Sequence, residues 1–193
     1  MRNSESDVRI ESTAIPSVFL LMPERMVDSR GYFVETFRAD QFTSVVGPIA
    51  FVQENQSLSR NAGTVRGLHF QLAPRAQGKL VSCIAGALWD VAVDLRVGSP
   101  TYGRSVAAVL SQKNGHQLWV PPGFAHGFCT LESRTIASYK VTEYYSPDYD
   151  RGLLWNDPAL EIEWPVLTSN AIISEKDRKQ PKLSELDSNF VFE

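Results

Sequence analysis

The sequence has few cysteines and histidines, no long apolar run and no excess of charge of one sign. Its two cysteines, Cys83 and Cys129, form no CxxC pair, and this count excludes a disulfide framework and a zinc finger. The stretch Met1–Glu11 is polar and mixed in charge, unlike a signal peptide, and the longest early apolar run, Val18–Met22, is too short to span a membrane. These absences predict a cytoplasmic protein that is not bound to a membrane.

Charge and motif content exclude several function classes. The chain carries 19 Lys and Arg against 22 Asp and Glu, a net charge of −3, which argues against nucleic-acid binding by bulk electrostatics. It lacks the GxGxxG, GxxxxGK[ST] and GxSxG patterns of dinucleotide sites, P-loops and hydrolase elbows. Its three histidines, His69, His116 and His126, do not pair on one strand as metal-binding barrels usually require, so we expect no metal.

What is present is a rhythm of short β-type runs separated by Gly, Pro, Asn and Asp, with 43% hydrophobic residues to build a core. Helical periodicity is convincing only in short pieces such as Arg38–Val45 and Glu175–Arg178. This pattern predicts one all-β domain over residues 1–193, of jelly-roll type with a few short helices. The expected strands are Val18–Met22, Tyr32–Phe37, Ala50–Ser57, Gly63–Phe70, Lys79–Ala85, Ala87–Arg96, Gly103–Leu110, His116–Val120, Gly127–Leu131 and Arg134–Tyr145.

Period-two alternation along two of these strands identifies polar side chains that share one face of a strand. Period two places Tyr139, Glu143 and Tyr145 on one face of Arg134–Tyr145, and Asp90 and Asp94 on one face of Ala87–Arg96. Acids or phenols on a single face of a barrel strand can belong to a pocket. The pattern alone favours the simpler interpretation, polar residues that face solvent.

Four further residues have both a structural and a chemical interpretation. His69 lies among apolar neighbours and suits a general base near neutral pH, although a lone histidine is more often a satisfied core residue. Lys79 opens an apolar strand, where a lysine usually extends to the surface from a sheet edge. Arg30 and Arg66 flank glycines and suit phosphate or carboxylate binding, or a surface turn. Strict alternation separates Arg66 from His69 unless Gly67 forms a bulge.

An ordered set of segments resembles the dTDP-4-dehydrorhamnose 3,5-epimerases, cofactor-free sugar-nucleotide epimerases with a cupin-type β-jelly roll. The segments run in order over nearly the whole chain, so together they are far more specific than any one of them. They are residues 28–35 (DSRGYFVE), 53–57 (QENQS), 66–71 (RGLHFQ), 77–79 (QGK), 90–96 (DVAVDLR), 98–103 (GSPTYG), 122–128 (PGFAHGF), 143–145 (EYY), 164–165 (WP) and 174–177 (SEKD).

The resemblance implies a role for each matching position. It identifies His69 as the base, Asp177 as the partner of that base, Tyr139 as the acid and Lys79 as the cation at the enolate oxygen. Tyr145 corresponds to an aromatic ring stacked on thymine. The other positions that hold the nucleotide sugar are Arg30, Glu35, Gln53, Asn55, Arg66, His126, Glu143 and Lys176. It further implies a homodimer, no cofactor, and a segment 166–193 that packs on the barrel.

The chemistry of a 4-keto sugar agrees with these roles. The hydrogens at C3 and C5 are acidic because the carbanion delocalises onto the C4 oxygen. Inversion requires proton removal from one face and return on the other, hence two groups, here a histidine and a phenol. A carboxylate such as Asp177 fixes the imidazole tautomer, and a cation at the enolate oxygen stabilises the transition state.

Three alternatives stay open. A monofunctional epimerase acting only at C3 or only at C5 of a related deoxysugar would carry the same residues. A jelly-roll protein that binds a nucleotide sugar without catalysing a reaction ranks second, and a metal-dependent cupin oxygenase ranks third.

Overall fold

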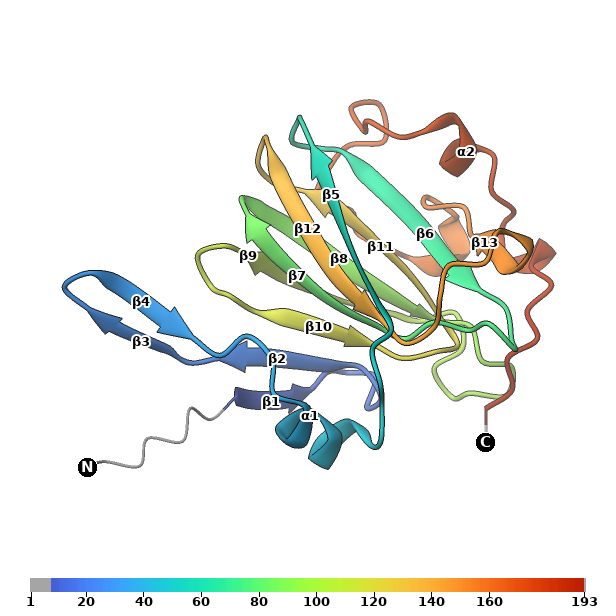
Figure 1. Ribbon diagram of the computed structural model, residues 1–193. Coiled ribbons are helices and arrows are strands. Elements are labelled where there is room, and N and C mark those ends of the chain that lie inside the picture. The colour runs from blue at the N-terminus through green and yellow to red at the C-terminus, as the bar shows by residue number, and fades with distance from the viewer. Residues whose placement is uncertain (1–7, 193) are drawn as a thin grey trace.

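The computed structural model describes residues 8–192, and in it two antiparallel sheets face each other (Figure 1). The first sheet has six strands in the order β1 (Val8–Ser12), β2 (Phe19–Pro23), β10 (Gln117–Val120), β7 (Lys79–Ala85), β12 (Thr135–Val141) and β5 (Gln53–Ser59). The second has five, in the order β13 (Asp150–Gly152), β6 (Val65–Gln71), β11 (Phe124–Thr130), β8 (Ala87–Asp94) and β9 (Ser105–Ser111). This arrangement confirms the predicted all-β jelly roll.

The core lies between the two sheets, because every second side chain of each strand points inward. Val81 and Leu118 from the six-stranded sheet meet Leu88, Leu110 and Phe128 from the five-stranded one. Burying each such side chain stabilises the fold by about 1.5–3 kcal/mol.

A two-stranded ribbon, β3 (Arg25–Asp28) and β4 (Gly31–Val34), extends away from both sheets (Figure 1). The guanidinium of Arg25 anchors its base by donating to the carbonyls of Gln112 and Lys113. After the ribbon, helix α1 (Ala39–Val46) packs through Phe42 onto the six-stranded sheet at Trp119. Strand β4 of the ribbon ends at Val34, so the strand predicted over Tyr32–Phe37 is wrong at its C-terminal end.

The C-terminal third covers the outer face of the five-stranded sheet. Leu153, Leu160 and Phe190 pack against Leu68 and Leu95 on that face. The helices of this segment are all short: η1 (Pro147–Tyr149), η2 (Pro158–Leu160), α2 (Glu175–Arg178) and η3 (Leu183–Glu185). No helix in residues 8–192 is both long and apolar enough to cross a membrane.

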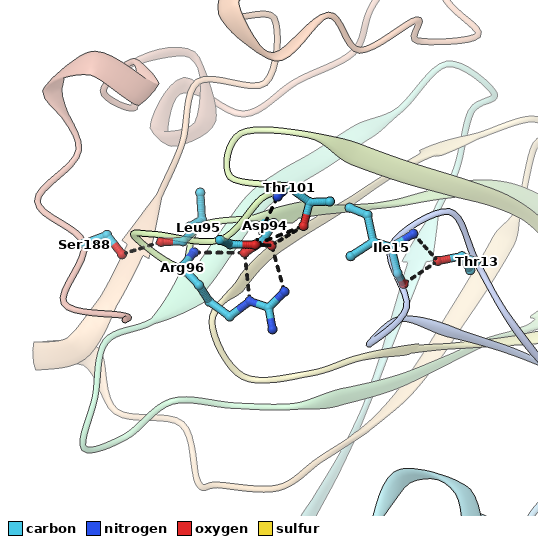
Figure 2. Close-up of polar contacts among 8 residues, drawn as sticks. Thr13, Ile15, Asp94, Leu95, Arg96, Thr101 and Ser188 are labelled. Carbon is cyan, nitrogen blue, oxygen red and sulfur yellow. Dashed lines mark hydrogen bonds and ion pairs between the residues drawn. The ribbon is translucent and has the colours of Figure 1, made fainter. Parts of the chain in front are cut away.

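Strand β8 is consequently buried on both faces, and the interpretation of its acids as solvent-facing is wrong. Asp90 and Asp94 have no exposed surface because they lie on the inner face, beside Leu88 and Ala92. Asp94 accepts hydrogen bonds from the Arg96 guanidinium at 2.7 and 2.9 Å and from the Thr101 hydroxyl at 2.7 Å (Figure 2). The 98–103 motif therefore serves to tie a loop to the end of β8.

Candidate active site

A cavity of about 520 Å³ lies between the two sheets and is lined by residues of both. An adjoining lobe of about 320 Å³ shares His69, Lys79 and Tyr139 with this main lobe, so the two form one site. The main lobe is lined by Ser57, Thr64, Val65, Arg66, His69, Lys79, His126, Phe128, Tyr139, Ile172, Ile173, Ser174, Lys176 and Asp177. The second lobe adds Gln53, Asn55, Phe70, Gln71, Gln77, Tyr145 and Asp150.

A β-bulge at Gly67 brings Arg66 and His69 to the same cavity. His69 pairs with His126 and Arg66 pairs with Phe128, so the two residues between them on β6 face a single residue of β11. Gly67 has φ of +109°, and a Cβ there would lie 2.6 Å from the carbonyl oxygen of His126. Only glycine fits this close approach, and it resolves the parity conflict that the sequence presented.

His69 and Asp177 form a hydrogen-bonded dyad. The imidazole Nε2 lies 2.6 Å from Oδ1 of Asp177, and the other carboxylate oxygen accepts the backbone N–H of Gly67 at 3.3 Å. Asp177 is buried in α2, whose N-cap Ser174 accepts its backbone N–H at 3.1 Å. Burial raises the pKa of Asp177, but the hydrogen bonds from His69 and Gly67 outweigh it and hold that pKa below its usual range.

The dyad leaves His69 ready to accept a proton. An ionised Asp177 takes the hydrogen on Nε2, so Nδ1 is the nitrogen that retains a lone pair. The His69 side chain is 33% exposed and lines both lobes, so it is not a satisfied core residue.

Tyr139 faces the same space from the opposite sheet. It stands on β12 of the six-stranded sheet, whereas His69 stands on β6 of the five-stranded one. Burial raises the pKa of the Tyr139 phenol, although the positive charge of Arg66 opposes the rise. The phenol therefore stays protonated at neutral pH and can act as an acid.

Lys79 is buried and lines both lobes together with these two groups, so the interpretation of it as an edge residue that reaches the surface is wrong. Its ammonium donates to the carbonyl oxygen of His69 at 3.2 Å. Burial lowers its pKa to about 8, while the negative charges of Asp150 and Asp90 act in the opposite direction.

Side chains from three segments line the second lobe. Gln53 donates to Asn55 at 2.8 Å along β5. Asp150 accepts from Lys176 at 2.5 Å and from the Tyr145 hydroxyl at 3.4 Å, and its hydrogen bond raises the pKa of Lys176. The lobe thus combines an exposed aromatic ring, amides and a carboxylate that accepts from Lys176 of the main lobe.

His126 lies at the inner wall of the main lobe and is held by a carboxylate. Its Nε2 is 2.8 Å from Oδ1 of Asp90, and both side chains are buried. Ser57 faces the same lobe with a buried hydroxyl that has no hydrogen-bond partner among residues 8–192.

Three of the residues predicted from the sequence do not line the site. Arg30, Glu35 and Glu143 are not among the described residues that line either lobe. Arg30 lies in the turn of the β3–β4 ribbon, paired with Asp28 at 2.5 Å and highly exposed. The Glu143 carboxylate accepts from Arg75 at 3.0 Å.

Sequence reasoning gave no role to Ser57, Asp90 or Asp150. Asp90 had a detectable signal, its place on one face of an alternating strand. Asp150 had no such signal, because it follows a one-turn 3-10 helix and begins a strand of only three residues. No group of three or more His, Cys, Asp or Glu side chains suited to a metal ion occurs in the described part of the chain.

Comparison with known proteins places this geometry in a family. The family model described as dTDP-4-dehydrorhamnose 3,5-epimerase matches residues 12–185. A dTDP-4-dehydrorhamnose 3,5-epimerase of Sinorhizobium fredii is 56% identical over 186 residues, covering 96% of this chain and 95% of the relative. A dTDP-4-dehydrorhamnose 3-epimerase of Streptomyces niveus is 36% identical, covering 92% of this chain and 85% of the relative.

The solved structures agree. An epimerase of Legionella pneumophila, crystallised with dTDP-4-keto-L-rhamnose, superposes with a TM-score of 0.91 at 39% identity, covering 97% of this chain and all of that one.

Proposed function

This chain belongs to the dTDP-4-dehydrorhamnose 3,5-epimerase family, and from that premise we propose how its residues work. The reaction is the conversion of dTDP-4-dehydro-6-deoxy-D-glucose to dTDP-4-dehydro-L-rhamnose by inversion at C3 and C5, a step in dTDP-L-rhamnose biosynthesis. One observation carries the proposal: an imidazole and a phenol stand on the two facing sheets of a single cavity.

His69 removes the proton from the sugar carbon. Its Nδ1 accepts the proton, and Asp177 stabilises the resulting imidazolium through the 2.6 Å hydrogen bond to Nε2. A positioned general base contributes about 10²–10⁴-fold to the rate.

Lys79 stabilises the enolate that this step creates. The electron pair of the broken C–H bond moves onto the C4 oxygen, and the buried ammonium supplies positive charge where water is largely excluded. A strong donor at such an oxyanion is worth about 3–4 kcal/mol.

Tyr139 then returns a proton to the opposite face of the carbon. Two groups are needed because a single base tends to return a proton to the face from which it came. The position of Tyr139 on the sheet opposite His69 supports this role.

The second lobe and the adjacent wall hold the nucleotide. Tyr145 offers its exposed ring to the thymine, while Gln53 and Asn55 supply amide groups beside it. Arg66 and Lys176 offer cationic groups to the diphosphate, and His126 lines the same lobe.

Proton NMR of the 4-keto-6-deoxyglucose nucleotide in heavy water tests the function. We expect deuterium at both C3 and C5, together with the signals of the L-sugar. Label confined to one carbon after prolonged reaction would instead establish a monofunctional epimerase, the activity named for the Streptomyces niveus relative. Binding without exchange at any carbon would refute epimerisation altogether.

We also infer that the protein acts as a homodimer. The β3–β4 ribbon exposes Val27 and Phe33, which are 76% and 64% accessible, on an arm that projects from the sheets (Figure 1). A second copy that covers this arm would bury those side chains and bring Arg30 and Glu35 to its own site. Sedimentation velocity should give the mass of two chains, and Arg30→Ala should weaken dTDP binding. A monomer with full activity would contradict the inference.

We propose a cytoplasmic location, since both cysteines are free thiols, as is usual in a reducing compartment. Cell fractionation with antibodies to the protein tests it, and recovery from an exported fraction would refute it.

A further inference from the structure

Strand β8 carries two buried carboxylates on one face, and they differ in how they are satisfied. Asp94 receives hydrogen bonds on both oxygens, from Arg96 and Thr101 (Figure 2) and from the Ser99 hydroxyl. Asp90, equally buried, is bonded only through Oδ1, to His126 at 2.8 Å. Its Oδ2 is buried without a hydrogen-bond partner among residues 8–192.

Burying a carboxylate with one oxygen that accepts no hydrogen bond lowers the stability of the fold, so neighbouring groups should account for its presence. Asp90 is opposite Phe128 in the β8–β11 register, directly behind the wall of the main lobe. It lies within electrostatic range of Lys79. Burial raises the pKa of Asp90, and the positive charges of His126 and Lys79 oppose that rise.

We propose that Asp90 is a positioning residue, which fixes the ring of His126 through Nε2 and supplies the negative charge against which Lys79 keeps its proton. This inference rests on the proposed function, because it concerns the same site. Asp90 itself does not line either lobe and acts only through the two residues that do.

The charge balance around Lys79 makes Asp90 important. Burial lowers the pKa of Lys79 to about 8, although the negative charges of Asp150 and Asp90 oppose that fall. The other ionisable side chains that line the lobes around it are Arg66, His69, His126, Tyr139, Tyr145, Lys176 and Asp177. Arg66 and Lys176 are positive and cannot hold a proton on Lys79, while Asp177 is committed to His69 and Asp150 to Lys176. Of the carboxylates named here, Asp90 is the one with a buried oxygen that has no hydrogen-bond partner among residues 8–192.

The second effect concerns His126. Because Nε2 faces Asp90, Nδ1 is the ring nitrogen left for the substrate. Loss of the carboxylate frees the His126 ring to rotate and to change tautomer, which weakens binding of the nucleotide sugar.

Asp90→Asn tests the proposal through the pH profile of epimerisation. We expect the alkaline limb of kcat/KM, which Lys79 sets near pH 8, to move to lower pH by about one unit, the usual effect of losing a nearby opposite charge. Asp94→Asn is the matched control, since it removes an equally buried carboxylate from the same face of the same strand. It should lower stability and leave the alkaline limb in place.

An unmoved limb in Asp90→Asn, or an equal movement in Asp94→Asn, would overturn the proposal. Should Asp90→Asn not fold, Asp90→Ser removes the same charge with a smaller side chain.

A second measurement does not depend on turnover. Acetylation of Lys79 by acetic anhydride at a series of pH values, read by mass spectrometry, reports when the amine loses its proton. Its midpoint should fall in Asp90→Asn and not in Asp94→Asn. If the wild-type enzyme fails to turn over the keto sugar, the proposed function is refuted, while the acetylation midpoint still decides the role of Asp90.

Discussion

Asp177→Asn isolates the contribution of the dyad, because the substitution keeps the shape of the side chain and removes its charge. In the wild type, one carboxylate oxygen accepts from Gly67 N–H and the other from Nε2 of His69. An amide has only one oxygen, and Gly67 N–H can donate only to that oxygen. The amide nitrogen must then face His69 and donate to Nε2, which forces the imidazole proton onto Nδ1.

This tautomer cannot accept a proton from the sugar. We therefore expect kcat/KM to fall by about 10²–10⁴-fold, the contribution of a positioned general base. Expressed as a barrier this is about 3–5 kcal/mol. The assay is the rate of deuterium incorporation at C3 and C5, followed by proton NMR in heavy water.

Glu175→Gln is the control for Asp177→Asn. It removes a carboxylate from the same helix α2, but Glu175 is exposed and pairs only loosely with Arg178 at 3.9 Å. Its exchange rate should equal that of the wild type. A folded Asp177→Asn protein that exchanges at the wild-type rate would refute the assignment of the dyad.

Four further outcomes are expected. Tyr139→Phe should retain much of the solvent exchange at the sugar carbons while net inversion falls, and equal loss of both in the NMR assay would contradict separate roles for acid and base. Wild-type kcat/KM should decline above pH about 8 as Lys79 loses its proton, and a profile flat to pH 10 would contradict its role. Asp94→Asn should lower the free energy of unfolding by about 3 kcal/mol in urea at pH 7. Hydrogen bonds hold the Asp94 pKa below its usual value despite burial, so this difference should shrink as pH falls through the folded-state pKa, and a pH-independent difference would contradict it. Gly67→Ala should lower the thermal midpoint and the exchange rate together, because its Cβ would lie 2.6 Å from a backbone oxygen of His126; unchanged values would show that the bulge can relax.

The strand pattern was predictable from sequence where strands are long and rich in apolar residues. Strand β7 and helix α2 match the predicted Lys79–Ala85 and Glu175–Arg178 to the residue. Strands β1, β3 and β13 were missed. β3 is a mostly exposed ribbon strand without apolar alternation, and β13 has three residues.

The site was less predictable, because its geometry depends on contacts between distant segments. Period two placed Tyr139 and Tyr145 on one face, yet β12 ends at Val141, so Tyr145 reaches the second lobe from a loop. Asp177 lies in what reads as a solvated charged run, and only the family resemblance indicated its partner. Nothing in the local sequence records that α2 lies against β6.

The order of these segments has a consequence for protein synthesis. Every strand of the described chain is complete by Gly152, whereas the carboxylate that orients His69 follows 108 residues after that histidine. A ribosome therefore releases all the strands of the barrel before the helix that carries Asp177 has emerged. A nascent chain at that stage can close its sheets and still hold a histidine whose tautomer nothing selects, so that catalytic competence is among the last properties the growing polypeptide acquires.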